Sequence, residues 1–166
     1  ESFEITKDTT IYLNNQIRME SNLEHIDEET GYDPIFTVNG ASLVIDVQKG
    51  YSGSLEYSGF GSPIQLIGNN QTKTSLTIYN GSFNNSLFYD YLTGGSGQST
   101  SIINVKNTTD SLVDIYLYGG SYQCQVLETC TFDGPIFTGS GYTTTIKGGM
   151  FYFDPSNIIE PGYVAI

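Results

Sequence analysis

The chain has 166 residues, a length that suits a single domain, and it carries 6 basic and 18 acidic side chains for a formal net charge of −12 at pH 7. Such a charge repels the phosphates of nucleic acids and of anionic lipids, so we expect neither as a partner. No stretch approaches the roughly 18 consecutive apolar residues that a membrane-spanning helix needs. Few charged residues (14%) together with many Gly, Ser, Thr, Asn and Tyr residues indicate an all-β protein with an uncharged polar surface.

The first 33 residues contain two different patterns. Residues 3–19 (FEITKDTTIYLNNQIRM) alternate apolar and polar side chains, which predicts strands of a short first repeat or of an N-terminal cap. Residues 20–33 hold six carboxylates, but the order Asp27-Glu28-Glu29-Thr30-Gly31 does not match the ligand spacing of an EF-hand loop. We therefore expect an acidic, solvated loop, with calcium binding as the alternative. The chain starts at Glu1 without a methionine, which fits either removal of a signal peptide or trimming of the chain.

From residue 34 onward the chain repeats one pattern. Each copy has an apolar run introduced by proline or serine, a polar turn, a second apolar run, glycine and an aromatic residue. Four copies are found: residues 34–51 (PIFTVNGASLVIDVQKGY), 62–83 (SPIQLIGNNQTKTSLTIYNGSF), 101–122 (SIINVKNTTDSLVDIYLYGGSY) and 135–151 (PIFTGSGYTTTIKGGMF). Four copies at similar spacing identify a repeat protein.

Three features align the copies. The first is a proline before an isoleucine, replaced in the third copy by Ser101-Ile102: Pro34-Ile35, Pro63-Ile64 and Pro135-Ile136. The second is an isoleucine in the inner apolar run: Ile45, Ile78, Ile115 and Ile146. The third is glycine followed by an aromatic residue: Gly50-Tyr51, Gly81-Ser82-Phe83, Gly120-Ser121-Tyr122 and Gly149-Met150-Phe151. We expect equivalent residues to stack in ladders of isoleucine and of Phe/Tyr.

Short runs rich in Ile, Val, Thr and Tyr and bounded by Gly, Asn and Pro are typical of strands, and no convincing helical period of about 3.6 is present. One coil of such strands cannot bury its own apolar face, so stacked copies bury it between them. The pattern predicts one all-β domain over residues 1–166, a parallel β-solenoid of about four to five irregular coils. Residues 1–33 would be the N-terminal cap or first coil, residues 34–151 the repeated coils and residues 152–166 a C-terminal cap. The alternative is an antiparallel β-sandwich, whose strands recur at similar spacing.

The longest departure from the repeat is an insertion, residues 84–101 (NNSLFYDYLTGGSGQSTS). Insertions in a solenoid usually map to loops on one face, which is often the binding face. The aromatic residues Phe88, Tyr89 and Tyr91 beside Asp90 could stack on a sugar ring or contact a protein partner. In the alternative interpretation these aromatic side chains pack back over the coil as local core.

Two cysteines, Cys124 and Cys130, lie six residues apart, and the only histidine, His25, is remote from them. Zinc is therefore disfavoured, and the alternatives are a disulfide across a short loop, which would indicate an oxidising compartment, or two free thiols. We predict the disulfide, and neither metal nor cofactor. Asn-x-Ser/Thr sequences begin at Asn70, Asn80, Asn84 and Asn107. Their number is close to what this composition produces by accident, so they say little about glycosylation.

Catalysis has weak support in the sequence. Several β-helix proteins are pectin-active lyases and hydrolases, and glycosidases need two carboxylates at a fixed separation. Asp46, Asp114 and Asp154 could project from one face of a solenoid. However, the chain has a single arginine, Arg18, and no motif that joins paired aspartates to a nearby His, Arg or Lys. The sequence argues against an enzyme without excluding one.

The last copy ends in residues 148–166 (GGMFYFDPSNIIEPGYVAI). This resembles a closing signature of right-handed parallel β-helix repeat proteins on the surface of gut bacteria and in their phages. The matching residues are Gly148, Gly149, Phe151, Asp154, Pro155, Ser156, Gly162 and Tyr163. The earlier YNGSF and YGGSY segments resemble the usual strand ending of that repeat, so the resemblance covers roughly residues 34–166. It implies an extracellular, cell-surface or virion setting, but such modules serve as adhesins, stalks and virion fibres alike.

The two ends of a solenoid expose unpaired backbone groups. Pro155 and Pro161 predict a cap at the C-terminal end, and the apolar tail after it could add a strand to a neighbouring subunit: Tyr163, Val164 and Ile166. Residues 2–13 (SFEITKDTTIYL) offer a matching edge. We predict a non-enzymatic structural or adhesive protein that assembles with itself into a homo-oligomer or filament, with a glycan or a host-surface protein as a further partner. The alternatives are a carbohydrate-binding module and a polysaccharide lyase or hydrolase.

Overall fold

The computed structural model describes residues 2–20, 33–58, 61–86, 101–110, 112–125, 134–152 and 162. Within these residues all regular structure is β-strand, in three five-stranded sheets whose strands pair in parallel throughout. The strands of any one sheet are three positions apart in the chain, so each coil contributes one strand to every sheet. This arrangement confirms the parallel β-solenoid and excludes the antiparallel sandwich.

The three sheets of the solenoid are called A, B and C. Sheet A contains β1 (Phe3–Ile5), β4 (Phe36–Asn39), β7 (Ile64–Ile67), β10 (Ile103–Lys106) and β13 (Phe137–Gly139). Sheet B contains β2 (Thr9–Tyr12), β5 (Ser42–Asp46), β8 (Thr74–Ile78), β11 (Val113–Leu117) and β14 (Tyr142–Ile146). Sheet C contains β3 (Gln16–Glu20), β6 (Ser54–Ser58), β9 (Ser82–Asn85), β12 (Ser121–Cys124) and β15 (Met150–Phe151).

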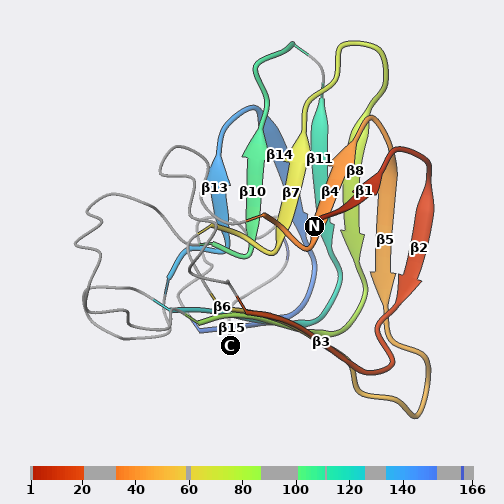
Figure 1. Cartoon of the computed structure of the whole chain (residues 1–166), viewed down its shortest axis with the longest axis vertical. Helices are drawn as coiled ribbons and strands as arrows, with labels where there is room; N and C mark the ends of the chain where they lie inside the picture. The colour runs from red at the N-terminus through yellow and green to blue at the C-terminus, as the bar shows by residue number, and fades with distance from the viewer. Residues whose placement is uncertain are drawn as a thin grey trace.

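The coils follow one another along a single axis, from the red first coil to the blue last coil in Figure 1. Residues 3–20 form a complete first coil, β1–β3, so the N-terminal pattern is a coil and the described residues form five coils. The predicted C-terminal cap, residues 152–166, lies outside the described residues except for Tyr152 and Gly162.

Alternation along each strand builds the core. In β5 the side chains of Leu43 and Ile45 are fully buried, whereas Ser42, Val44 and Asp46 between them are only partly buried. Successive side chains of a strand point to opposite faces, so one set faces the interior and the other faces solvent. Because the strands are in register, each buried side chain packs on its counterpart in the next coil.

The isoleucine ladder differs from the predicted alignment in the fourth coil. Ile45 pairs with Ile78 as expected, but Ile78 pairs with Leu117, and Ile115 pairs with Leu76. The prediction that aligned Ile115 with Ile78 is therefore wrong by two residues. A shift of two keeps the same face inside, since side chains alternate with a period of two, so the pattern alone could not set this register.

The proline alignment is wrong by one residue in the third coil. Ile64 pairs with Phe36 and with Ile103, so Pro63, and not Ile64, is the counterpart of Ile35 and Ile102. The carbonyl of Pro63 accepts the amide of Ile35 at 2.8 Å. Proline lacks an N–H to donate, but it precedes the first residue of β7, where this loss does not interrupt the ladder.

The aromatic ladder forms in three of the four predicted copies. The rings of Phe83 and Tyr122 stack with centroids 5.3 Å apart, and those of Tyr122 and Phe151 stack at 5.2 Å. Tyr51 is not part of this ladder: it lies in the turn between β5 and β6 and is 59% exposed, while Leu55 pairs with Phe83. The glycine before each ladder aromatic has a positive φ, for example 99° at Gly120, a conformation that favours glycine.

Candidate functional site

Most residues predicted to form functional sites lie outside the described residues. These are the insertion residues Phe88, Tyr89, Asp90 and Tyr91, the tail residues Tyr163, Val164 and Ile166, the carboxylate Asp154 and Cys130. Cys124 is buried at the end of β12. The Cys124–Cys130 disulfide, the binding loop and the assembly tail therefore stay predictions.

The structure does show where the insertion is anchored. Asn84 and Asn85 belong to β9, so the insertion begins after them and not at residue 84. The buried Asn85 side chain donates through Nδ2 to the carbonyls of Gly61 and Ser101, both at 2.9 Å. Since Ser101 lies where the insertion returns to the solenoid, this amide joins the two ends of the insertion to each other and to the preceding coil.

The long connections all leave sheet C for the next coil. They comprise 15 residues between β3 and β4 (21–35), 17 between β9 and β10 (86–102) and 12 between β12 and β13 (125–136). The fourth connection of this kind, 59–63, has five residues, and those at the other two corners have two to seven. From the sequence we identified one insertion, residues 84–101, whereas the strand bounds place three long connections at the same corner of the coil. The sequence pattern does not show which connections share a corner.

A polar cluster surrounds Asp114 on the outer face of sheet B. The side chain of Asp114, which is 11% exposed, forms an ion pair with the Lys73 ammonium. It also accepts the hydroxyl of Tyr116 at 3.1 Å and that of Thr143 at 2.5 Å. Lys73, Asp114 and Thr143 belong to the third, fourth and fifth coils, so the cluster fastens three coils together.

Hydrogen bonding keeps the Asp114 carboxylate charged. Burial alone would raise the pKa of Asp114, but the bonds from Lys73, Thr143 and Tyr116 outweigh burial and hold that pKa below its usual range. The hydrogen bond to Asp114 raises the pKa of Lys73. A carboxylate that is ionised and bonded at both oxygens is poorly suited to act as a general acid at neutral pH, so the cluster fits a structural role.

The turns that lead from sheet B to sheet C carry exposed tyrosines. Tyr79 and Tyr118 are 50% and 40% exposed, and their rings stack with centroids 5.2 Å apart at an interplanar angle of 13°. The Lys147 ammonium lies 6.0 Å from the centroid of the Tyr118 ring. Because these rings cover each other and Lys147 lies over Tyr118, they offer less open ring face for stacking on a sugar than isolated tyrosines would.

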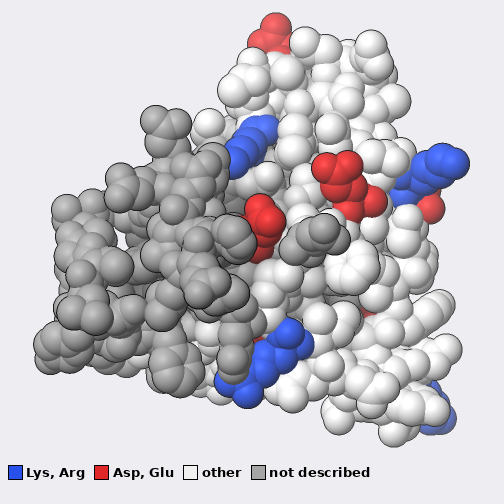
Figure 2. All heavy atoms as spheres, in the orientation of Figure 1, with Lys and Arg blue, Asp and Glu red and all other residues white. Residues whose placement is uncertain are grey.

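Outer side chains of sheet A hydrogen-bond between coils without using charge. The hydroxyls of Ser2 and Thr37 lie 2.9 Å apart, the Asn69 amide donates to Asn39 at 3.0 Å, and the Asn104 amide donates to Thr138 at 2.9 Å. Figure 2, which views this side of the molecule, shows its charged side chains scattered among uncharged ones.

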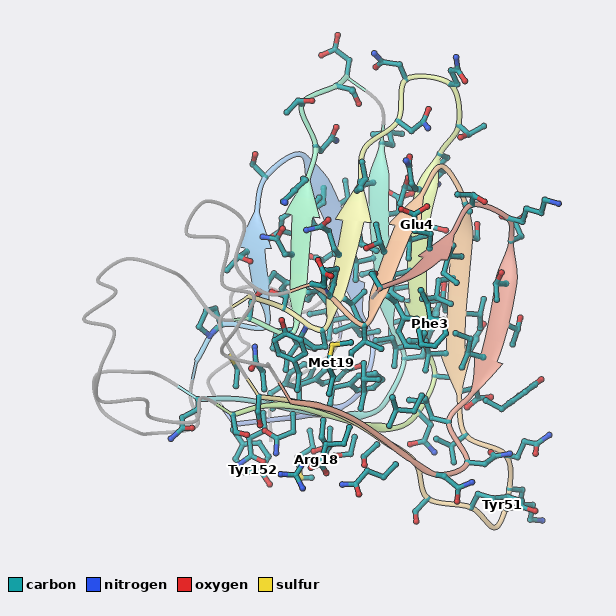
Figure 3. The ribbon with its side chains drawn as sticks, in the orientation of Figure 1. Phe3, Glu4, Arg18, Met19, Tyr51 and Tyr152 are labelled. Carbon is teal, nitrogen blue, oxygen red and sulfur yellow. The ribbon has the colours of Figure 1, made fainter. Side chains whose placement is uncertain are left out.

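The first coil ends the stack of described strands. Among the described residues, strands β1, β2 and β3 each pair on one side only, with β4, β5 and β6. Phe3 is 63% exposed, whereas its partner Phe36 is 4% exposed. Four apolar side chains of its strands are only partly buried, Ile5, Ile11, Ile17 and Met19, whereas Leu13 in the turn between β2 and β3 is 1% exposed. Figure 3 shows Met19 pointing toward the interior and its neighbour Arg18 pointing outward.

Among the described residues, no three His, Cys, Asp or Glu side chains lie close enough together to hold a metal ion. The same part of the chain contains no helix long and apolar enough to cross a membrane. Comparison with known proteins found no matching family model, no similar curated protein and no similar solved structure.

Proposed function

We propose that this protein is a non-enzymatic structural and adhesive module of an extracellular, cell-surface or virion setting, and that it assembles with copies of itself. The support is the use that the described residues make of their polar groups. The Asp114 cluster, the sheet A side chains and the Asn85 amide all form hydrogen bonds between coils. These hydrogen bonds stabilise the stack of coils, and they leave few of the polar groups in these clusters free to take part in catalysis.

The one-sided pairing of the first coil is the observation that carries self-assembly. No described strand pairs with the outer edges of its three strands, and these edges lie beside apolar side chains that a further coil would bury. A segment that pairs with all three edges at once needs the same three-sided shape. We propose that a second copy of this chain binds this end, either through its last coil, which has three strands, or through its tail residues 163–166, which could add a strand to one of the three edges only.

The charged side chains Glu4, Lys7 and Arg18 on the first coil discourage indiscriminate strand pairing. They therefore favour a partner that complements their charges over non-specific aggregation. In an oxidising setting the proposed Cys124–Cys130 disulfide would in addition close the connection after β12.

Light scattering over a range of protein concentrations tests the assembly. We expect a mass above that of the monomer, which Phe3→Ser should reduce, because Phe3 is an exposed apolar side chain of the first coil. Tyr79→Ser is the control, since Tyr79 is also an exposed aromatic side chain but follows β8 in the third coil, away from the first coil. Deleting residues 163–166 tests the tail separately. A full-length protein that stays monomeric at high concentration would contradict self-assembly.

A further inference from the structure

A small cavity of about 270 Å³ lies between the turns that join sheets A and B in the fourth and fifth coils. Asn107, Thr109, Asp110 and Leu112 from the connection between β10 and β11 form one wall, and the connection from β13 to β14 with the start of β14 forms the other. Its lining residues are Asn107, Thr109, Asp110, Leu112, Val113, Gly141, Tyr142 and Thr143. The volume is just below the roughly 300 Å³ at which pockets for drug-sized molecules begin, so the site suits one small group.

Several polar groups of the lining are already used. The Asn107 amide donates to the carbonyl of Gly141 at 2.6 Å, and its oxygen accepts the backbone amide and the hydroxyl of Thr109 at 3.0 and 2.8 Å. The Thr143 hydroxyl donates its proton to Asp114. A hydroxyl has one proton, so Thr143 can only accept a hydrogen bond from a ligand. These bonds hold the two walls in place before any ligand arrives.

Other groups of the lining have unused capacity. Within the described part of the chain, neither the Asp110 carboxylate nor the Tyr142 hydroxyl has a hydrogen-bond partner. The Tyr142 side chain is half-buried, and burial raises its pKa, so the phenol is neutral. Leu112 is 61% exposed. The cavity therefore combines an unpaired carboxylate, an aromatic ring and an exposed aliphatic side chain.

We infer that this cavity binds a primary alkylammonium group, such as the end of a lysine side chain or the amine of an amino sugar. An ammonium offers three donors and no acceptor, which matches the Asp110 carboxylate and the accepting Thr143 hydroxyl. The aliphatic stem of such a group would pack on Leu112 and on the Tyr142 ring. The net charge of −12 favours a cation and disfavours an anion.

Two other ligand classes fit the lining less well. A calcium ion takes about six to eight oxygen ligands, and the lining has one carboxylate. A neutral sugar needs donors as well as acceptors, and apart from the Tyr142 hydroxyl the donors identified in the lining are used within the protein. This inference does not depend on self-assembly, since all eight lining residues lie in one chain.

Amide-proton NMR of the full chain, titrated with butylammonium chloride, tests the inference. Sodium chloride at equal ionic strength and 1-butanol serve as controls. We expect saturable shifts at Leu112, Gly141 and Tyr142 with butylammonium alone. Asp110→Asn should weaken this binding about tenfold, because it removes one charge-assisted hydrogen bond. Asp33→Asn, an exposed aspartate far along the chain, makes the same change in net charge and should leave the affinity within about twofold.

Further titrations identify the source of the ammonium and can overturn the assignment. Binding of poly-lysine points to a protein partner, and binding of glucosamine but not glucose points to an amino sugar. Equal binding of glucose and glucosamine would make the cavity a neutral-sugar site and overturn the inference. If Asp110→Asn and Asp33→Asn weaken butylammonium binding equally, the net charge of the protein attracts the cation and the Asp110 carboxylate does not bind it specifically. That result would overturn the inference. An absence of saturable shifts, with the wild-type spectrum folded, would reject the site.

Discussion

Ile11 and Ile78 belong to one ladder, both through Ile45, yet they lie in very different surroundings. Ile78, in the third coil, is 0% exposed, whereas Ile11, in the first coil, is only partly buried. Residue type, strand position and facing direction are the same. Among the described strands, those of the third coil pair on both sides and those of the first coil on one side only, which accounts for the difference. In this solenoid the burial of a side chain therefore depends on neighbouring coils more than on its own sequence context.

Truncating the interior ladder should have the largest effect on stability. Ile78→Ala removes a fully buried side chain and should lower the free energy of unfolding by about 2–5 kcal/mol. Ile11→Ala makes the same chemical change where solvent already reaches the side chain and should lower it by only about 1 kcal/mol. Urea unfolding of both variants measures the comparison. Equal losses would mean that the first coil is covered in solution, for example by a second copy.

Removing the Asp114 charge should have an intermediate effect. Asp114→Asn breaks the ion pair with Lys73 and weakens the contact with Thr143, so we expect a loss of about 1–3 kcal/mol at pH 7. Folding lowers the pKa of Asp114, so its contribution is complete above the unfolded pKa of about 3.9 and disappears as the pH falls through the lower folded value.

Unfolding of wild type and Asp114→Asn at pH 7 and at about pH 2 checks this dependence. The two proteins should differ at neutral pH, and this difference should shrink as the pH falls through the lowered pKa of Asp114 and the wild-type carboxyl loses its charge. Asp33→Asn, at an exposed aspartate, is the control and should show no such convergence. If the difference in the free energy of unfolding persists unchanged in acid, the loss does not come from the charge of the Asp114 carboxylate.

Changes in the acidic segment should have the smallest effect. Glu28 and Glu29 lie outside the described residues, and the sequence predicts a solvated loop there. Replacing both with Gln should change stability by no more than about 0.5 kcal/mol per site in the same urea assay. A loss as large as that of Ile78→Ala would contradict the view that the repeated coils hold the core.

The repeats predicted the fold because residue type, turn residues and repeat spacing all indicated the same architecture. Short β-rich runs, turns with Gly and Asn and four similar copies all indicated stacked strands, and the structure has three parallel sheets. The candidate sites were less predictable. The aromatic insertion was visible in the sequence, but the cavity beside Asp110 was not, because its two walls come from residues about thirty positions apart whose spacing carries no recognisable motif.

What the sequence by itself determined is the coil: where strands begin, which side chains alternate inward, and that one coil must lie on the next. Only the tertiary structure decided the register between coils. It paired Ile78 with Leu117 in place of Ile115, and it moved Pro63 by one position. It also brought Lys73, Asp114 and Thr143 to one point from three coils. The physical reason is that a period of two constrains the face of each side chain but not its partner, which packing and turn length select together.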